Sequence, residues 1–326
     1  SHRAVTANAN EFWVVWPSNG YLNGGPVSLA GKPGAKVVVN VGGTSPAVSS
    51  DGSGYLVAWG IGVLRTVKIN AAGKVSHPSN VITNGGYPVL AFDGAKHLAL
   101  YTAVGKHGIQ GCLLSSTGAM SGTEFSVTSA PFVSRPAVAF DGTRYLVVWA
   151  DTKKPMLYGR FVDTTGKPDP VTHTLEAGGT GLLETPRVAH GGGKFLAVWS
   201  DTRNTGYDLL GTLVSVSKTK RTLKKIQLAT YTASKEMFPR VSYTQGRFLV
   251  VWMDIGVKAV RTMRGTQVTL DGVPIHAPVP ATFTTVSSYS SRVEMASVGD
   301  KTLLVWGSPG KTSWEYTRSK LITFGK

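Results

Sequence analysis

Seven short apolar segments in this sequence share one fixed internal spacing. Each ends in an aromatic residue 13 positions after an opening residue, which is proline in five of the seven. The closing aromatics are Trp16, Trp59, Tyr101, Trp149, Trp199, Trp252 and Trp306, and the opening residues are Arg3, Pro46, Pro88, Pro136, Pro186, Pro239 and Val293. Successive segments lie 42 to 54 residues apart. A constant unit with variable connections is typical of a repeat fold.

The fourth unit shows what one repeat contains. Residues 136–140 form a short first strand, and Asp141-Gly142 predicts a hairpin turn because both residue types tolerate positive φ. Residues 145–149 form a continuous apolar run, which we expect to be a strand buried on both faces. Residues 157–163 and 171–175 predict a third and a fourth strand, joined by a turn at 165–168.

The same pattern recurs along the chain. The Asp-Gly turn is repeated at Asp51 and Asp93, and a third-strand glycine recurs at Gly111, Gly159, Gly211 and Gly265. We find no convincing helix. Repeated four-stranded sheets predict an all-β fold, a seven-bladed β-propeller of four-stranded antiparallel blades, built by a single domain over residues 1–326. One sheet cannot bury both of its faces alone, so the closing aromatics are expected in the core, where each buries about 150–250 Å².

A family resemblance follows from these residues. The unit Pro-x-Val-Ala-x-Asp-Gly-x-x-Tyr-Leu-Val-Val-Trp-x-Asp at 136–151 resembles a propeller repeat abundant in secreted and surface proteins of myxobacteria and related bacteria. Its layout is also similar to the propeller of the translocation protein TolB. The resemblance implies the fold and a secreted, cell-surface or periplasmic location, and it implies no catalytic residue. Units one and seven depart most from the pattern, and unit seven is expected to stop after its third strand, 316–324.

Charge is the most informative part of the composition. The 326 residues carry a formal net charge of +16, and the calculated pI is about 9.9. A basic surface attracts polyanions such as nucleic acid or acidic polysaccharide, or it serves solubility alone. The single cysteine, Cys112, excludes an intrachain disulfide. No apolar stretch is long enough for a transmembrane segment, and we expect a monomer.

The predicted ligand-binding face is lined by cations. In a propeller, the starts of the innermost strands and the loops after the second strands share one face, which commonly carries ligands. The candidate ligand-binding residues there are Arg135, Arg187, Arg240, Arg292, Lys106, His107, Lys153 and Arg203. Arginines can hold carboxylate, sulfate or phosphate groups with paired hydrogen bonds. The alternative is that they pair with acidic residues and hold neighbouring units together.

Other charged groups are expected to be structural. Asp151, Asp201 and Asp254 recur two residues after the closing aromatic, and a group needed in every unit favours loop capping over catalysis. A second basic cluster at 218–225 is either a docking site for polyanions or a solvated hairpin tip. No metal-ligand or catalytic motif is present, so we predict no catalytic residue, no metal and no cofactor.

These observations favour a non-catalytic, secreted or cell-surface propeller that binds a protein partner or an anionic glycan at the central funnel. The alternative is a propeller enzyme, a polysaccharide hydrolase or lyase or a lactonase-like enzyme, with its site at the channel mouth. Fold alone does not separate the two, because propellers carry both kinds of function. A nucleic-acid partner is the least favoured interpretation, since the aromatics belong to the core pattern rather than to a basic surface.

Overall fold

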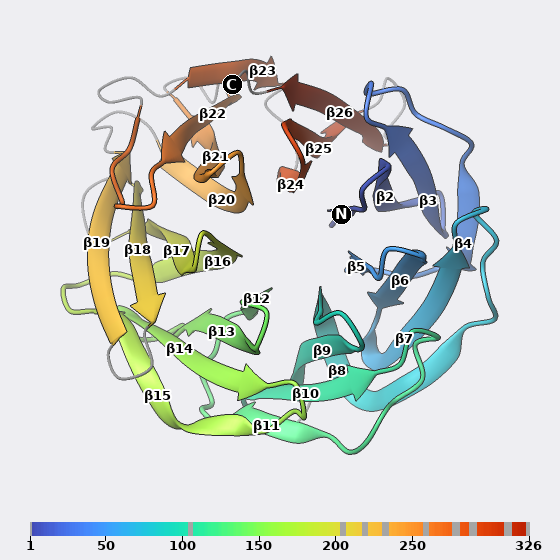
Figure 1. Ribbon diagram of the computed structural model, residues 1–326, viewed down its shortest axis with the longest axis horizontal. Helices are drawn as coiled ribbons and strands as arrows, with labels where there is room; N and C mark the ends of the chain where they lie inside the picture. The colour runs from blue at the N-terminus through green and yellow to red at the C-terminus, as the bar shows by residue number, and fades with distance from the viewer. Residues whose placement is uncertain are drawn as a thin grey trace. The chain divides into compact units, whose positions relative to one another are not determined.

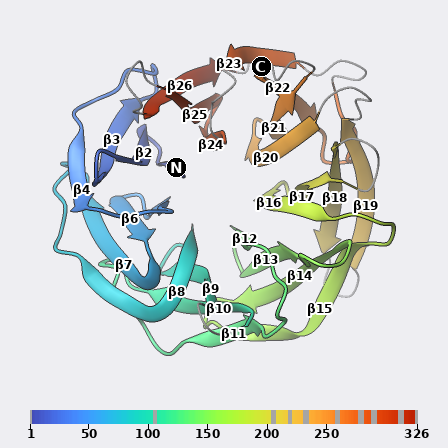
Figure 2. The same ribbon diagram turned by 180° about the vertical axis from the view of Figure 1, so that it is seen from behind.

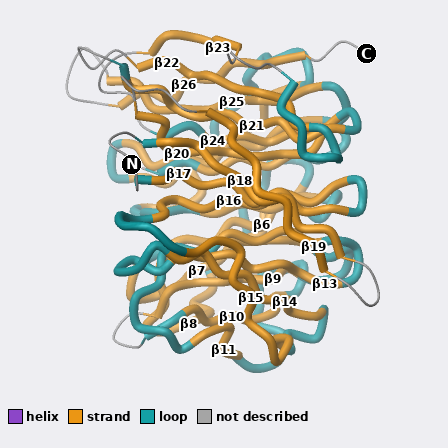
Figure 3. The backbone as a smooth tube through the Cα atoms, turned by 90° about the vertical axis from the view of Figure 1, so that its left-hand side faces the viewer, coloured by secondary structure: helices purple, strands orange, loops and turns teal. Residues whose placement is uncertain are grey.

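The computed structural model describes residues 2–103, 107–202, 207–216, 221–229, 235–256, 261–275, 281–286, 292–309 and 315–323. Within these ranges the protein has 26 strands in six antiparallel sheets. The described elements are all strands and no helix is drawn, as Figures 1 and 3 show. The predicted all-β class is therefore confirmed, and four of the six sheets described have the predicted four antiparallel strands. No segment in the described part of the chain is a helix that could cross a membrane.

The chain divides into two compact units. Unit 1 comprises Ser1–Pro131, Asp163–Pro168 and Glu294–Lys326, and unit 2 comprises Phe132–Val162 and Asp169–Val293. Each unit is built from sheets that pack face to face, and each is described by itself below.

Unit 1 contains three sheets. The first has the order β1-β2-β3-β4, with bounds Ala4–Ala7, Glu11–Ser18, Tyr21–Ser28 and Val37–Val41. The second runs from β5 to β11, with bounds Ala47–Ser50, Gly54–Trp59, Ile61–Asn70, Ser79–Phe92, His97–Ala103, Ile109–Leu114 and Phe125–Thr128. The third has three strands, β24 (Glu294–Val298), β25 (Lys301–Pro309) and β26 (Glu315–Thr323), and it packs on the first sheet. Both ends of the chain thus share one core.

Unit 2 contains the other three sheets, which can be followed from behind in Figure 2. They are β12-β13-β14-β15, with bounds Ala137–Phe140, Arg144–Ala150, Met156–Asp163 and Pro168–Ala177; β16-β17-β18-β19, with bounds Leu183–Gly191, Lys194–Asp201, Asp208–Val216 and Arg221–Ala229; and β20-β21-β22-β23, with bounds Lys235–Thr244, Arg247–Ile255, Arg261–Val268 and Ala281–Val286. The first strands of neighbouring sheets, β12 with β16 and β16 with β20, pack together.

The second sheet of unit 1 differs from the expected pattern of separate four-stranded sheets. β8 is one continuous strand of 14 residues; its first half pairs with β7 and its second half pairs with β9. The change of partner occurs at a bulge between Gly86 and Val89, where Tyr87 has a φ of 57°. Two predicted units therefore share a strand, because the connection between them stays extended.

The predicted Asp-Gly turns are confirmed. Asp51, Asp93 and Asp141 each close a hairpin, and their carboxylates accept backbone N–H groups two residues ahead at 2.8–2.9 Å. The glycines that follow, Gly52, Gly94 and Gly142, have φ between 83° and 98°. Hydrogen bonds to the Asp141 carboxylate from Thr143 and from the Arg144 backbone lower the pKa of Asp141, although desolvation acts in the opposite direction.

The core lies between facing sheets and is filled from the second strands. Every residue of β6 is buried, which confirms the prediction of a strand covered on both faces. In unit 1 one core cluster joins β1–β4 to β5–β7 around Trp59, and another joins β24–β26 to β1–β3 beside Trp16. We call these the Trp59 interface and the Trp16 interface.

Candidate functional site

The described arginines predicted to bind a ligand lie in unit 2, but Arg187 and Arg240 are not at the starts of their strands as expected: they are the fifth residue of β16 and the sixth of β20. Arg187 in β16 is opposite Val198 and Arg240 in β20 is opposite Val251, so the two occupy equivalent positions. The Nη1 of each donates a hydrogen bond of 2.8 Å to the carbonyl of the preceding proline. Arg187 is half-buried, whereas Arg240 is only 4% exposed. Arg240 is therefore largely part of the protein interior.

The other predicted residues are more scattered. Arg135 and Arg292 are half-buried in unit 2, and the Arg292 guanidinium lies 4.5 Å from the ring centre of Phe238. Lys153 is exposed in unit 2, and His107 is exposed in unit 1. Lys106 and Arg203 lie outside the described residues. Ligand binding by this set stays a prediction.

One of the three recurring aspartates, Asp151, is shown to have the loop-capping role that the sequence suggested. Asp151 accepts backbone N–H groups from Lys153 and Lys154 at 2.7 and 3.0 Å, so it caps its own loop. Asp254 is buried and forms an ion pair with Arg264. In the second basic cluster, Lys225 pairs with Glu176 at 2.9 Å. Within the described ranges, no three histidine, cysteine or acidic side chains gather in a way that would hold a metal ion.

Trp16 is the exception among the closing aromatics. The other six are between 0% and 7% exposed, as expected for core residues. Trp16 is half-buried instead, so the prediction of a core role is wrong at this position. Its neighbour Trp13 points to the opposite face of the sheet, where it is buried against Tyr55 with ring centres 4.8 Å apart. The face of the sheet that carries Trp16 is therefore the incompletely covered one.

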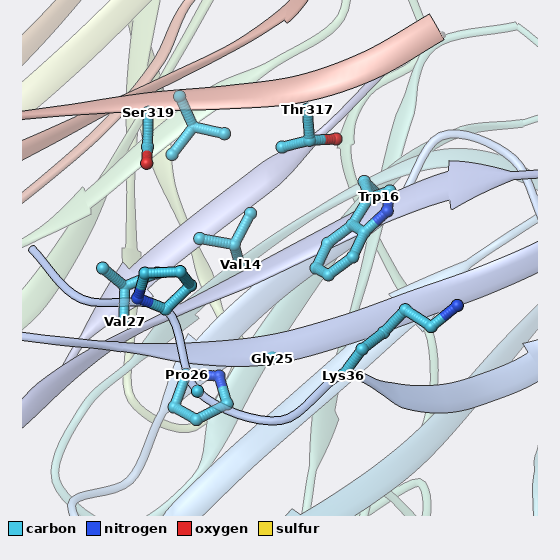
Figure 4. Close-up of a pocket in the computed structure, with 11 residues that line it drawn as sticks. Val14, Trp16, Gly25, Pro26, Val27, Lys36, Thr317 and Ser319 are labelled. Atoms are coloured by element: carbon cyan, nitrogen blue, oxygen red, sulfur yellow. The ribbon is translucent and has the colours of Figure 1, made fainter. Parts of the chain in front are cut away.

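A cavity of about 310 Å³ lies beside Trp16, between the first and third sheets of unit 1. Figure 4 shows Val14 and Trp16 projecting toward it from β2, with Thr317 and Ser319 of β26 on one side and Pro26 and Lys36 on the other. The remaining lining residues are Gly25, Val27, Pro33, Gly34 and Val305. The lining is thus mainly apolar, with two hydroxyls and one ammonium group available for polar contacts.

The strand register explains why the cavity exists. Ser319 lies opposite Val305, the residue before the closing aromatic, and this is the position that glycine holds in β10, β18 and β22. Thr317 lies two residues earlier in β26. The equivalent residues of other third strands are all fully buried and apolar: Leu22, Leu64, Ile109, Leu209 and Met263. A smaller polar side chain thus replaces a core residue. The Thr317 hydroxyl accepts a hydrogen bond of 3.1 Å from Nε of the buried Arg3.

The sequence prediction did not include these residues. The missed signal was the pair Thr317 and Ser319, which replaces the large apolar residue and the glycine found in most other third strands; β7 has Thr66 at the glycine position. It becomes visible only when unit seven is aligned on the glycine position as well as on its closing aromatic.

Comparison with known proteins establishes the fold. No protein-family model matches the sequence, and no curated protein matches it. Among solved structures, the chain is similar to the β-propeller domain of Myceliophteria thermophila Cps50 (Swd1), with a TM-score of 0.60 and 11% identity over 97% of this chain and 96% of that chain.

Two further structures extend the comparison to enzymes. A prolyl endopeptidase matches with a TM-score of 0.54 and 13% identity over 98% of this chain and 46% of that chain. The dihydro-heme d1 dehydrogenase NirN in complex with DHE matches with a TM-score of 0.52 and 15% identity over 98% of this chain and 74% of that chain. At these identities the likeness shows a β-propeller fold alone, since this fold carries catalytic and non-catalytic functions.

Proposed function

We propose that this protein is a seven-bladed β-propeller that acts as a non-catalytic binding module, with a protein partner bound at the Trp16 cavity. The blade count is supported by the seven sequence units, with β8 serving two of them and β24–β26 forming the last. The observation that carries the binding role is the half-buried Trp16 beside a cavity of about 310 Å³.

The lining favours an apolar group of a polypeptide. Val14, Val27, Pro26 and Pro33 surround Trp16, and such surfaces bind apolar side chains. Tryptophan is also the residue type that most often dominates the affinity of a protein interface. Among the residues lining the cavity, Lys36 is the one with a titratable side chain, so the cavity offers no acid–base pair for the enzymatic alternative.

An array experiment tests this proposal. Labelled protein is applied to an array of random eight-residue peptides and to a glycan array, and the Trp16→Ala variant is compared with Arg187→Ala. We expect the wild type to capture a subset of peptides and Trp16→Ala to lose at least about tenfold in affinity, as for an aromatic hot spot. Arg187→Ala should retain this capture. Unchanged peptide capture by a folded Trp16→Ala variant would contradict the proposal.

An anionic glycan at the arginines of unit 2 is the second candidate. The observation favouring it is that Arg135, Arg187 and Arg292 are half-buried in or just before first strands, in a chain of net charge +16. In this case glycan capture should fall steeply with added salt and should fall in Arg187→Ala but not in Trp16→Ala. Glycan capture that is insensitive to salt and to Arg187→Ala would exclude it.

A further inference from the structure

The fourth strand has a recurring task in this fold. In four interfaces between successive repeats, an apolar residue from the fourth strand of one repeat shares a core cluster with the closing aromatic of the next; in one of the four, the two repeats share the seven-stranded sheet of unit 1. The pairs are Val39 with Trp59, Ile82 with Tyr101, Leu175 with Trp199 and Leu228 with Trp252. All eight side chains are at most 6% exposed. The closing aromatic is therefore covered by a strand that belongs to its neighbour.

Among the described residues, no fourth-strand side chain covers Trp16 in this way. In the described part of the chain, β26 pairs with β25 on one side and with no strand on the other. The cavity beside Trp16 lies next to Thr317 and Ser319 of β26. Ser319 is exposed, while the corresponding Gly24 of β3 is buried under Val39 of the fourth strand, whose Cγ2 lies 3.0 Å from the position of an added Cβ. The cavity thus lies where a fourth-strand side chain would pack.

We propose that the outer edge of β26 accepts an extended segment of a partner polypeptide as a fourth strand, with one apolar side chain of that segment in the Trp16 cavity. This inference rests on the proposed function and specifies how the partner binds. An exposed strand edge presents unpaired N–H and C=O groups, and adding a strand satisfies them while a pocket selects a side chain.

Charge identifies the kind of segment. Arg318 is exposed on β26, and the exposed Lys36 lines the mouth of the cavity. None of the cavity-lining residues is acidic. A segment with Glu or Asp beside its apolar residue therefore complements this edge, and a basic segment is repelled. A second copy of β26 is disfavoured for the same reason, because two such edges would bring like charges opposite each other.

The probe is a capped eight-residue peptide that alternates Glu and Val, with a Lys and Val peptide as its matched control. Binding to the full chain is measured by calorimetry. We expect the Glu peptide to bind at least about tenfold more tightly than the Lys peptide, and Arg318→Glu to remove most of this preference. Trp16→Ala should weaken both peptides. Because Arg318 is exposed on a strand, Arg318→Glu is expected to fold, and it still tests the inference if Trp16→Ala folds poorly.

Backbone methylation separates strand addition from simple pocket binding. Two further peptides of the same Glu and Val sequence carry backbone N-methyl groups on alternate residues. In one peptide (the first frame) the methyl groups are on the Glu residues, and in the other (the second frame) they are on the Val residues. Only one edge of an added strand faces β26, so one frame should abolish binding and the other should retain it. Equal binding of the two frames overturns the inference, as does equal binding of the Glu and Lys peptides.

The outcomes distinguish the inference from the proposed function. If the Glu and Val peptide does not bind while array peptides are still captured in a Trp16-dependent way, strand addition fails and the binding module stands. If neither this peptide nor any array peptide is captured, both fail. If Trp16→Ala leaves array capture unchanged, the Trp16 cavity is not the site.

Discussion

The Trp59 and Trp16 interfaces are built from equivalent strands, yet one is closed and the other is open. At the Trp59 interface, Leu22 and Val39 of the preceding sheet complete the core, and Trp59 is 1% exposed. At the Trp16 interface, Thr317 stands in place of Leu22 and no fourth strand contributes among the described residues. The same aromatic position is therefore structural in one place and accessible in the other. Accessibility here depends on the neighbouring sheet rather than on the tryptophan.

Truncating the two tryptophans is the strongest way to break this comparison. We expect Trp59→Ala to lower the free energy of unfolding by about 3–5 kcal/mol, because it removes a fully buried indole and leaves a cavity. Trp16→Ala should cost only about 1–2 kcal/mol, since much of the indole already lies against open space. Urea unfolding monitored by circular dichroism measures both. Equal costs would show that the Trp16 interface is as tightly packed as its counterpart.

A third interface of unit 1 sharpens the comparison, because it encloses a polar group. His97 is fully buried, its Nδ1 lies 2.7 Å from Ser49 Oγ, and its ring packs against Phe92. Burial lowers the pKa of His97 to about 4, with Lys68 acting in the same direction and the charges of Asp51 and Asp93 opposing the shift. The unfolded chain thus binds a proton between pH 6.5 and 4 that the folded chain does not.

The expected result is a loss of stability as the pH falls through this window. The contribution of His97 is complete above pH 6.5, and about 3 kcal/mol should be lost by pH 4. His97→Phe places an aromatic ring where the other sheets have Tyr145, Phe195 or Phe248, and it should flatten this part of the pH profile. The exposed His107 supplies the control, since His107→Gln should leave the slope unchanged. A retained slope in His97→Phe would assign the effect to other groups.

Much of the closed interfaces could be predicted from the sequence, because each feature there repeats a local physical requirement. The turns need residues that tolerate positive φ, as at Gly52 and Gly142. The second strands need continuous apolar residues, and the third-strand glycine gives room to a fourth-strand side chain; at Gly159 an added Cβ would lie 3.0 Å from Leu175. Such requirements recur in each unit and are therefore visible in one sequence.

The open interface could not be predicted in the same way. Thr317 and Ser319 resemble ordinary residues of a half-exposed strand. Their role appears only from the strand opposite and from the fact that, in the described part of the chain, β26 has no second neighbour. The burial of the arginines could not be predicted from the repeat pattern either. Arg187 and Arg240 share a repeat position, and each follows a bulge with a positive φ, at Thr185 and at Phe238, yet one is half-buried and the other buried.

Exchanging the residues that distinguish the two interfaces is the finest test of the comparison. Leu22→Thr should cost about 2 kcal/mol, since it removes buried apolar atoms and introduces a hydroxyl into a dry core. Thr317→Leu should change stability by less than about 1 kcal/mol, because apolar burial in the cavity offsets the loss of the hydrogen bond from Arg3. Urea titration of both variants reveals the asymmetry. If Thr317→Leu proves as costly as Leu22→Thr, the threonine is itself a core residue, and the open space beside Trp16 is too narrow to accept a partner side chain.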